Sequence, residues 1–326
     1  MPKAKVKKSP AKAAKKVAKK APAKKHIQHV NGFMGAPGTG KTAAMAVLEH
    51  DKNLKHLKKQ LKLDRDLSYA IARKATSRPS RGADDRFKIA GLPEDYFKDD
   101  KMIGVYVLAN NGSLYGYHPD EFQHGADIIV AEPSIHHIRA VKDHLGKRLT
   151  TVLLVADNPY RLERMNGRGT EDPKQIQQRL VEGDAQVYVA NMLTGGLKDR
   201  YDNMIDAGRL IDDGLHDQFE AISASAESGD AESADQGLYE FLLKYVAGDA
   251  GVNDPDVQKY AKGAVAEYGP LIRKATQSVM EQGLIDYIIA LDQSYYHPNF
   301  LVEGKFRDEI VDIAGESIGR WMNRDE

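Results

Sequence analysis

The sequence has no cysteine among its 326 residues. This absence excludes disulfide bonds, thiolate metal sites and cysteine nucleophiles, and it favours an intracellular, cytoplasmic location. Long apolar runs are also lacking: no stretch of about 18 apolar residues occurs, so the sequence predicts no membrane-spanning helix. The first residues have no apolar segment of the kind that secretory signals need, so export is not expected. The eleven histidines are not spaced with carboxylates in a pattern that would complete a zinc site.

Acidic and basic residues are equal in number, 47 of each, but they are unevenly distributed. Residues 1–25 contain eleven lysines and no acidic residue, so the remaining chain carries eleven more acidic than basic residues. Because the lysines repel one another and prolines interrupt the segment, we predict that residues 1–25 form a disordered arm. This lysine-rich arm resembles the tails of linker histones and histone-like bacterial proteins. Such an arm would bind nucleic-acid phosphates without reading sequence, which would favour nucleoid or nuclear association. A solubility or targeting role, or contact with the acidic remainder of the chain, stays open.

Beyond residue 26 the chain alternates short apolar runs with segments of helical periodicity. We expect strands over the apolar runs at 27–33, 103–108, 127–131 and 151–156. We expect helices over the periodic segments at 42–50, 54–61 and 135–144. Strands that alternate with helices are typical of an α/β fold with a parallel sheet flanked by helices.

Composition suggests how the chain divides into regions. Residues 26–213 carry the α/β pattern, and residues 214–237 are interpreted as a linker because much of this segment is small, polar and acidic. In residues 238–326 apolar side chains recur at helical spacing. We therefore expect an extra C-terminal helical region whose apolar stripes form a core.

A glycine-rich segment follows the first expected strand. Residues 35–42 have the sequence GAPGTGKT, which fits the pattern G-x-x-x-x-G-K-T. Its glycines allow a tight turn that directs backbone N–H groups at phosphate oxygens, and the following helix N-terminus favours anions. Lys41 would reach the β- and γ-phosphates as a catalytic residue, and the Thr42 hydroxyl would bind Mg²⁺. We therefore predict ATP and Mg²⁺ as cofactors, bound by Gly35, Gly38, Thr39, Gly40, Lys41 and Thr42.

Later stretches follow this loop in a characteristic order. Residues 75–81 have the sequence ATSRPSR, residues 112–116 GSLYG, and residues 162–180 LERMNGRGTEDPKQIQQRL. Together with the loop they resemble the guanylate kinase family over about residues 26–213, and YDNMI at Tyr201–Ile205 is similar to the family's final strand. The resemblance implies a phosphate-loop kinase fold with an acceptor-binding subdomain and a lid.

Arg78 and Arg81 lie three residues apart in a segment rich in serine and proline. Two guanidinium groups in such a loop can clamp an acceptor phosphate, and the hydroxyl of Tyr115 can donate to the same phosphate. The resemblance implies that these residues bind the acceptor monophosphate.

The stretch 162–180 resembles the lid of the family. Phosphoryl transfer needs positive charge around the moving group and exclusion of water, and a closing lid with arginines supplies both. The resemblance implies that Arg168 and Arg179 contact the phosphates as catalytic residues and that Arg164 lies against the adenine.

Glu132 follows the expected strand 127–131. A carboxylate at the carboxyl end of a strand beside a phosphate loop is placed to hold Mg²⁺ or a metal-bound water, together with Thr42. The family has a second acidic residue where this chain has Ser134, which we assign to the acceptor site.

The positions that read the base depart from the family pattern. Its guanine-reading glutamate is replaced by Tyr106, the small hydroxyl residue after YG is Tyr117, and the late asparagine near the adenine aligns with Ala207. The family's G-E-x-x-G-x-x-Y element is reduced to residues 82–87. Because buried donors and acceptors discriminate strongly between bases, guanine is not the expected acceptor base. Tyr106 and Tyr117 would stack on a different base or fill its space.

These features predict ATP-dependent phosphorylation of a nucleoside or deoxynucleoside monophosphate to the diphosphate, with no general base. One alternative is a sugar-phosphate kinase of the same fold, similar to ribose bisphosphate kinases. A second is a non-catalytic binding module, against which the intact loop argues. A third is a DNA-associated ATPase, suggested by the lysine-rich arm.

Overall fold

The computed structural model describes the following residues: 27–80, 82–107, 112–156, 158–168, 172–173, 175–176, 179–180, 183, 221–222, 224–226, 228–247, 252–277, 284–291, 295 and 299–325. None of the helices within these ranges combines the length and the apolar character needed to cross a membrane. The lysine-rich arm, Arg81, Tyr201–Ile205 and Ala207 lie outside the described residues, so their expected roles stay predictions.

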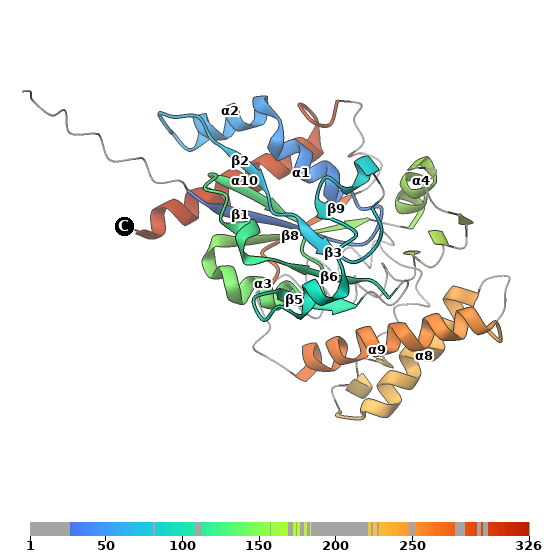
Figure 1. Ribbon diagram of the computed structural model, residues 1–326. Coiled ribbons are helices and arrows are strands. Elements are labelled where there is room, and N and C mark those ends of the chain that lie inside the picture. The colour runs from blue at the N-terminus through green and yellow to red at the C-terminus, as the bar shows by residue number, and fades with distance from the viewer. Residues whose placement is uncertain are drawn as a thin grey trace, which may run out of the picture.

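Within the described residues, five parallel strands form the main sheet (Figure 1). Their order across the sheet is β2-β7-β1-β8-β9, and each neighbouring pair is parallel. The strands are β1 (His29–Met34), β2 (Tyr69–Ile71), β7 (Ile128–Ala131), β8 (Leu149–Ala156) and β9 (Tyr287–Leu291). Because the strands are parallel, their carboxyl ends share one edge of the sheet, which brings together the loops that follow them.

Helices cover both faces of this sheet (Figure 1). Side chains alternate along β8: Val152 and Leu154 belong to one core cluster, and Leu153 and Val155 belong to the other. The first cluster is covered by α1 (Lys41–Glu49), α2 (Asp51–Gln60) and α10 (Lys305–Met322). The second includes side chains of α3 (Ile138–Leu145), α8 (Ala231–Ala247) and α9 (Pro255–Gln277). Burial on both faces explains why β8 has a continuous apolar sequence.

A smaller sheet is inserted in the chain between β2 and β7. In the described residues its order is β4-β3-β6-β5, with β3 and β4 parallel and the other pairs antiparallel. Its strands are β3 (Lys74–Thr76), β4 (Lys88–Ile89), β5 (Ile103–Val107) and β6 (Leu114–Tyr117). Short 3₁₀ helices lie in and around it: η1 (Gly82–Asp85), η2 (Glu94–Lys98) and η3 (Pro119–Phe122). Others are η4 (Gly146–Arg148), before β8, and η9 (Asn323–Asp325), after α10.

The expected elements of the first half are confirmed to within a few residues. The strands expected at 27–33, 127–131 and 151–156 are β1, β7 and β8, and the helices expected at 42–50 and 135–144 are α1 and α3. The α/β class with a parallel sheet flanked by helices is therefore observed.

The expectation for the C-terminal region is wrong in one respect. Residues 238–326 are not entirely helical, because β9 pairs with β8 and completes the main sheet. A buried five-residue apolar run, YIIAL, has no periodicity that distinguishes a strand from part of a helix. The expected linker also contains the start of α8, whose first turn is capped by Asp230 Oδ1 accepting from Ser233 N at 3.0 Å.

Candidate functional site

The loop between β1 and α1 has a backbone that requires glycine at several positions. Gly35, Gly38 and Gly40 have φ of 138°, 86° and 91°, in the region that side chains disfavour. A Cβ on Gly35 would collide with the carbonyl of Leu154, and one on Gly38 would lie 3.0 Å from the carbonyl oxygen of Arg161. The hydroxyl of Thr39 donates to the carbonyl of Ala36 at 2.9 Å, bracing the turn. These constraints fit a loop that presents backbone N–H groups to phosphates.

Lys41 is the first residue of α1 and folds back onto the loop. Its ammonium donates to the carbonyl oxygens of Gly35 at 2.7 Å and Ala36 at 2.9 Å. The same nitrogen lies 3.9 Å from Glu132 Oε1. Thr42 follows on the exposed side of the helix start. The ammonium is thus held within the loop, where a nucleotide phosphate would compete for it.

Glu132, directly after β7, is surrounded by lysines. Lys88 Nζ lies 3.3 Å from Glu132 Oε2, while Lys41 approaches the other oxygen. Lys74 and Lys88 are register partners on β3 and β4, so the smaller sheet presents both to the same place. Burial by itself would raise the pKa of the Glu132 carboxyl, but Lys88, Lys74 and Lys41 hold this pKa well below its usual range. Glu132 is therefore an anion that partly neutralises a cationic cluster.

Lys74 is the most enclosed lysine of this cluster, with 4% of its surface exposed. Burial lowers the pKa of its ammonium to about 8; Glu132 opposes this shift, and Lys88 and Arg78 reinforce it. Sequence reasoning did not select Lys74 or Lys88. The available signal was a lysine beside an alanine in a short buried strand, a position that a structural lysine rarely occupies.

Arg78 and Tyr115, both assigned to the acceptor phosphate, lie together. Both are buried, and Tyr115 is among the groups that raise the pKa of the Arg78 guanidinium against the lowering effect of its burial. Lys74 Nζ lies 5.9 Å from the centroid of the Tyr115 ring. The Arg78 guanidinium is bound by both carboxylate oxygens of Asp85, which sequence reasoning did not select, and donates to the carbonyl of Pro79 at 2.8 Å. Asp85 therefore occupies the guanidinium nitrogens of Arg78 that would bind an acceptor phosphate.

Tyr106 and Tyr117 are both used in packing. The Tyr106 ring stacks on Tyr115 at 5.5 Å and on His136 at 4.7 Å between centroids. Tyr117 is fully buried and stacks on His137 at 5.4 Å, and its hydroxyl accepts a hydrogen bond from the Glu132 backbone N–H at 3.0 Å. Burial raises the pKa of this hydroxyl well above its usual value. In this arrangement Tyr117 helps to position the backbone of Glu132.

Ser134 lies close to these aromatic rings and contacts one of them, His137. Its hydroxyl is 2.9 Å from His137 Nδ1, and its backbone N–H donates to the same nitrogen at 3.2 Å. Burial holds the pKa of His137 well below its usual value, so the ring is neutral. Ser134 thus orients a ring that packs on the tyrosines.

The helix α4 (Asn158–Arg168) begins shortly after β8 and carries an arginine that sequence reasoning missed. Arg161 is 1% exposed, and its Nε donates to the carbonyl of Pro37 in the phosphate loop at 3.1 Å. Its terminal nitrogen donates to the carbonyls of Arg179 at 3.2 Å and Leu180 at 3.0 Å. One buried guanidinium therefore joins the phosphate loop to the segment that resembles a lid.

The arginines assigned to the lid are placed unequally. Arg164 donates to the Tyr160 hydroxyl at 3.1 Å, and a Cβ on Gly40 would lie 3.9 Å from its terminal nitrogen, so it flanks the end of the loop. Arg179 is partly buried. Arg168 ends α4, and its side chain lies outside the described residues.

The expected cofactors fit this site to different degrees. The glycine turn and Lys41 suit nucleotide phosphates. Among the described residues, no group of three or more histidine, aspartate or glutamate side chains gathers to hold a metal. Glu132 faces Lys41 and Lys88, so it suits Mg²⁺ better through water than as a direct ligand. Mg²⁺ commonly keeps several waters and binds substrate phosphates, which is compatible with Thr42 and a nearby carboxylate.

Comparison with known proteins adds little. No protein-family model matches the chain, and no curated protein matches its sequence. Among solved structures, a guanylate kinase from Anaplasma phagocytophilum is similar, with a TM-score of 0.26 and 11% identity over 45% of this chain and 67% of that chain. A likeness at this TM-score carries no conclusion about the activity of this chain.

Proposed function

We propose that the chain transfers the γ-phosphoryl group of ATP to a small acceptor that already carries a phosphate. The observation that carries this proposal is the convergence of Lys41, Lys74 and Lys88 around Glu132, between the phosphate loop and the smaller sheet. An excess of ammonium groups at this point suits the meeting of two phosphate groups, whose repulsion is the main obstacle to transfer.

Each group has a role in this proposal. Lys41 neutralises charge on the β- and γ-phosphates, and the loop N–H groups hold them. Arg78 and Tyr115 bind the acceptor phosphate once Arg78 leaves Asp85, and Lys74 and Lys88 lower the repulsion between acceptor and donor. A phosphate oxygen is itself a competent nucleophile, so positioning and charge suffice and no side chain needs to remove a proton. Arg164, Arg168 and Arg179 belong to the proposed lid.

The first candidate acceptor is a nucleoside or deoxynucleoside monophosphate, with a base other than guanine. A sugar phosphate is the second candidate, and the packing of the tyrosines favours it. Tyr117 is fully buried and Tyr106 is stacked on Tyr115 and His136, so both rings fill space that a base would need.

The test is a coupled ADP-release assay with Mg·ATP against all ribo- and deoxynucleoside monophosphates and against ribose phosphates. Lys41→Ala is the inactive variant, and Lys52→Ala, at an exposed position on α2, is the matched control. Turnover with one acceptor, lost in Lys41→Ala alone, supports the kinase and identifies its acceptor. ADP release without any acceptor, or only with DNA, would replace the kinase by an ATPase.

A further inference from the structure

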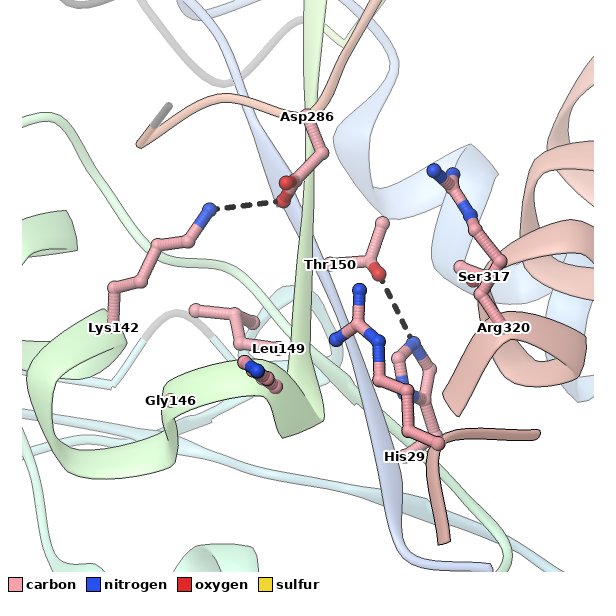
Figure 2. Close-up of a pocket in the computed structure, with 10 residues that line it drawn as sticks. His29, Lys142, Gly146, Leu149, Thr150, Asp286, Ser317 and Arg320 are labelled. Carbon is pink, nitrogen blue, oxygen red and sulfur yellow. Dashed lines mark hydrogen bonds and ion pairs between the residues drawn. The ribbon is translucent and has the colours of Figure 1, made fainter. Parts of the chain in front are cut away.

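A pocket lies at the opposite edge of the main sheet from the phosphate loop. It has a volume of about 360 Å³ and is framed by the amino-terminal ends of strands, including His29 of β1 and Thr150 of β8. Since β1 has six residues, roughly 17 Å separate this edge from the loop. Figure 2 shows Lys142 and Asp286 at one side, Ser317 and Arg320 at the other, and His29 and Thr150 between them. None of these residues has a role in the proposed kinase reaction.

Basic side chains predominate in this pocket. Lys142, Lys147, Arg320 and Arg324 line it, and the carboxylate that lines it is Asp286. Asp286 is already engaged by Lys142 Nζ at 3.0 Å. Arg320 has an exposed partner, Glu316, one turn earlier on α10 at 3.4 Å. Lys147 and Arg324 have no carboxylate partner within the described part of the chain, so the pocket carries unneutralised positive charge.

A further cation, Arg148, lies close enough to His29 to act on its ring. The guanidinium of Arg148 donates to the carbonyl oxygens of Gln28 at 3.1 Å and Phe122 at 3.2 Å. Neither partner carries a charge, and burial lowers the pKa of this guanidinium. Arg148 therefore adds to the positive potential that an anion in the pocket would experience.

His29 lines the pocket with an unsatisfied ring nitrogen. The side chain is 1% exposed, and its Nε2 lies 3.1 Å from the Thr150 hydroxyl. Its Nδ1 has no hydrogen-bond partner among the described residues. Burial, followed by the charges of Arg148, Arg324 and Arg320, lowers the pKa of His29 to about 3, so the ring is neutral at physiological pH. When Thr150 donates to Nε2, the proton lies on Nδ1, which can then donate to a bound anion.

We propose that this pocket is a second phosphate-binding site, which takes a small phosphate-bearing ligand no larger than a mononucleotide. Lysine and arginine groups at the rim supply the charge, and the Nδ1–H of His29 supplies a neutral donor at its wall. The volume falls in the range of small-molecule sites. The same chemistry would bind a backbone phosphate of a nucleic acid, and residues 1–25, with eleven lysines, precede His29 closely in the chain.

Trp321 provides a reporter for this edge of the molecule. It is the single tryptophan of the chain, its ring lies 6.5 Å from that of His29, and its Nε1 donates to the Ile27 carbonyl at 2.9 Å. Its emission should therefore change when the pocket fills. The full chain is titrated with sodium pyrophosphate, with adenosine 5′-monophosphate and with a short single-stranded oligonucleotide, and the same titrations on Lys41→Ala remove any contribution of the phosphate loop.

The variant that tests the site is Lys147→Glu with Arg324→Glu, two exposed rim positions at which a charge change should leave the fold intact. The matched control is Lys52→Glu with Lys101→Glu, equally exposed and outside the pocket. Pyrophosphate affinity should fall about tenfold or more in the rim variant and stay unchanged in the control and in Lys41→Ala. Protection of Lys142 and Lys147 from acetylation, followed by mass spectrometry, detects a ligand that leaves the emission unchanged.

The outcomes separate the two sources of phosphate. Saturable responses to the small phosphates, weakened in the rim variant, support a small-ligand site. A response confined to the oligonucleotide and weakened in the rim variant supports the phosphate chemistry and assigns it to nucleic acid. Equal titrations of rim variant and control, or no change in emission and lysine reactivity with any ligand, would overturn the proposal.

Discussion

The two edges of the main sheet both gather positive charge, but they do so for different reasons. At the carboxyl edge, Lys41, Lys74 and Lys88 converge on the partly buried Glu132. This carboxylate lies beside a loop whose backbone requires glycine at several positions. At the amino edge, basic side chains project from the C-terminal ends of α3 and α10 and from the 3₁₀ turns that follow them. A helix C-terminus carries partial negative charge, which favours cations there in any α/β protein.

This difference decides how strongly the positive charge at each edge indicates a bound ligand. The helix dipole accounts for basic residues at the amino edge, so the charge there is weak evidence for a ligand by itself. The Nδ1 of buried His29, which has no hydrogen-bond partner in the described part of the chain, has no such explanation. At the carboxyl edge the N-terminus of α1 carries partial positive charge, which by itself favours binding of an anion. The additional lysines at this edge are therefore needed only if more than one anionic group is to be bound. Removing the charged groups at each edge separates these two explanations.

The largest effect is expected from removal of residues 1–25. Non-specific DNA affinity should fall by about 10³-fold at low salt, with a shallower salt dependence, because eleven lysines are lost. Turnover in the proposed kinase reaction should not change, since the phosphate loop lies at the opposite end of β1 from residue 27. Filter binding at several salt concentrations measures the first quantity, and unchanged DNA retention after the deletion would contradict a nucleic-acid role for the arm.

Lys41→Ala should lower kcat by about 10²- to 10³-fold, because it removes a preorganised charge from the transferring phosphoryl group. Its thermal midpoint should stay within a few degrees of the wild type, since the carbonyls of Gly35 and Ala36 that the ammonium binds belong to a turn that Thr39 also braces. The ADP-release assay measures the change. Equal turnover in Lys41→Ala and Lys52→Ala would show that the loop does not carry the reaction.

Arg161→Ala should lower the free energy of unfolding by about 2 to 3 kcal/mol, because it leaves the buried carbonyl of Leu180 and the partly buried carbonyls of Pro37 and Arg179 without their charged donor. Arg86→Ala is the control. Its side chain is about half exposed and pairs with Glu49, so its loss should cost under about 1 kcal/mol. Urea unfolding compares the two variants, and equal values would mean that the bridge from the phosphate loop to Arg179 and Leu180 contributes nothing to stability.

Acceptor binding should weaken at alkaline pH because of Lys74. Its pKa of about 8 means that the ammonium loses its proton between pH 7 and 9, so KM for the acceptor should rise roughly tenfold over this range. Lys74→Met should have a high KM that no longer varies with pH.

The same shift has a consequence for stability. The folded-state pKa lies below the ordinary value of 10.5, so unfolded chains bind this proton more tightly. The contribution of Lys74 to stability is therefore present above about pH 10.5 and is lost as pH falls towards 8.

A KM for the acceptor that does not change between pH 7 and 9 would show that Lys74 does not belong to the acceptor site.

The smallest effect is expected at the amino edge. Asp286→Asn removes the carboxylate that competes for Lys142, so pyrophosphate should bind about threefold more tightly to the pocket. The amide can still accept from the Thr151 backbone, so stability should change little. Trp321 emission measures the affinity. Weaker binding in Asp286→Asn would indicate that the pocket favours a cation.

The first half of the fold followed from short-range patterns. β7 and the last five residues of β8, VLLVA, are continuous apolar runs, which are typical of strands buried on both faces, and β1 is rich in apolar residues. β9 was missed, because it pairs with β8 across more than 130 residues and its own five residues have no distinguishing periodicity. The start of α8 was missed because small acidic residues resemble a linker until Asp230 caps them as a helix.

The candidate site divides in the same way. The phosphate loop was recognisable from the sequence alone, since its glycines and lysine act on one another over eight adjacent residues. Arg78 and Tyr115 were expected to share a ligand, and the structure brings them together. Lys74, Lys88, Asp85 and Arg161 were not expected, because each acts through a partner that lies far away in the chain or carries no recognisable pattern.

The sequence by itself therefore determined the α/β class, the glycine loop and the lysine-rich arm, all of which depend on neighbouring residues and on composition. Only the tertiary structure decided which charges meet. Register between β3 and β4 aligns Lys74 with Lys88, and the parallel main sheet places Glu132 beside the phosphate loop. Coulomb interactions act over a few ångströms in space and take no account of distance along the chain, so a cluster of this kind exists only after the chain has folded.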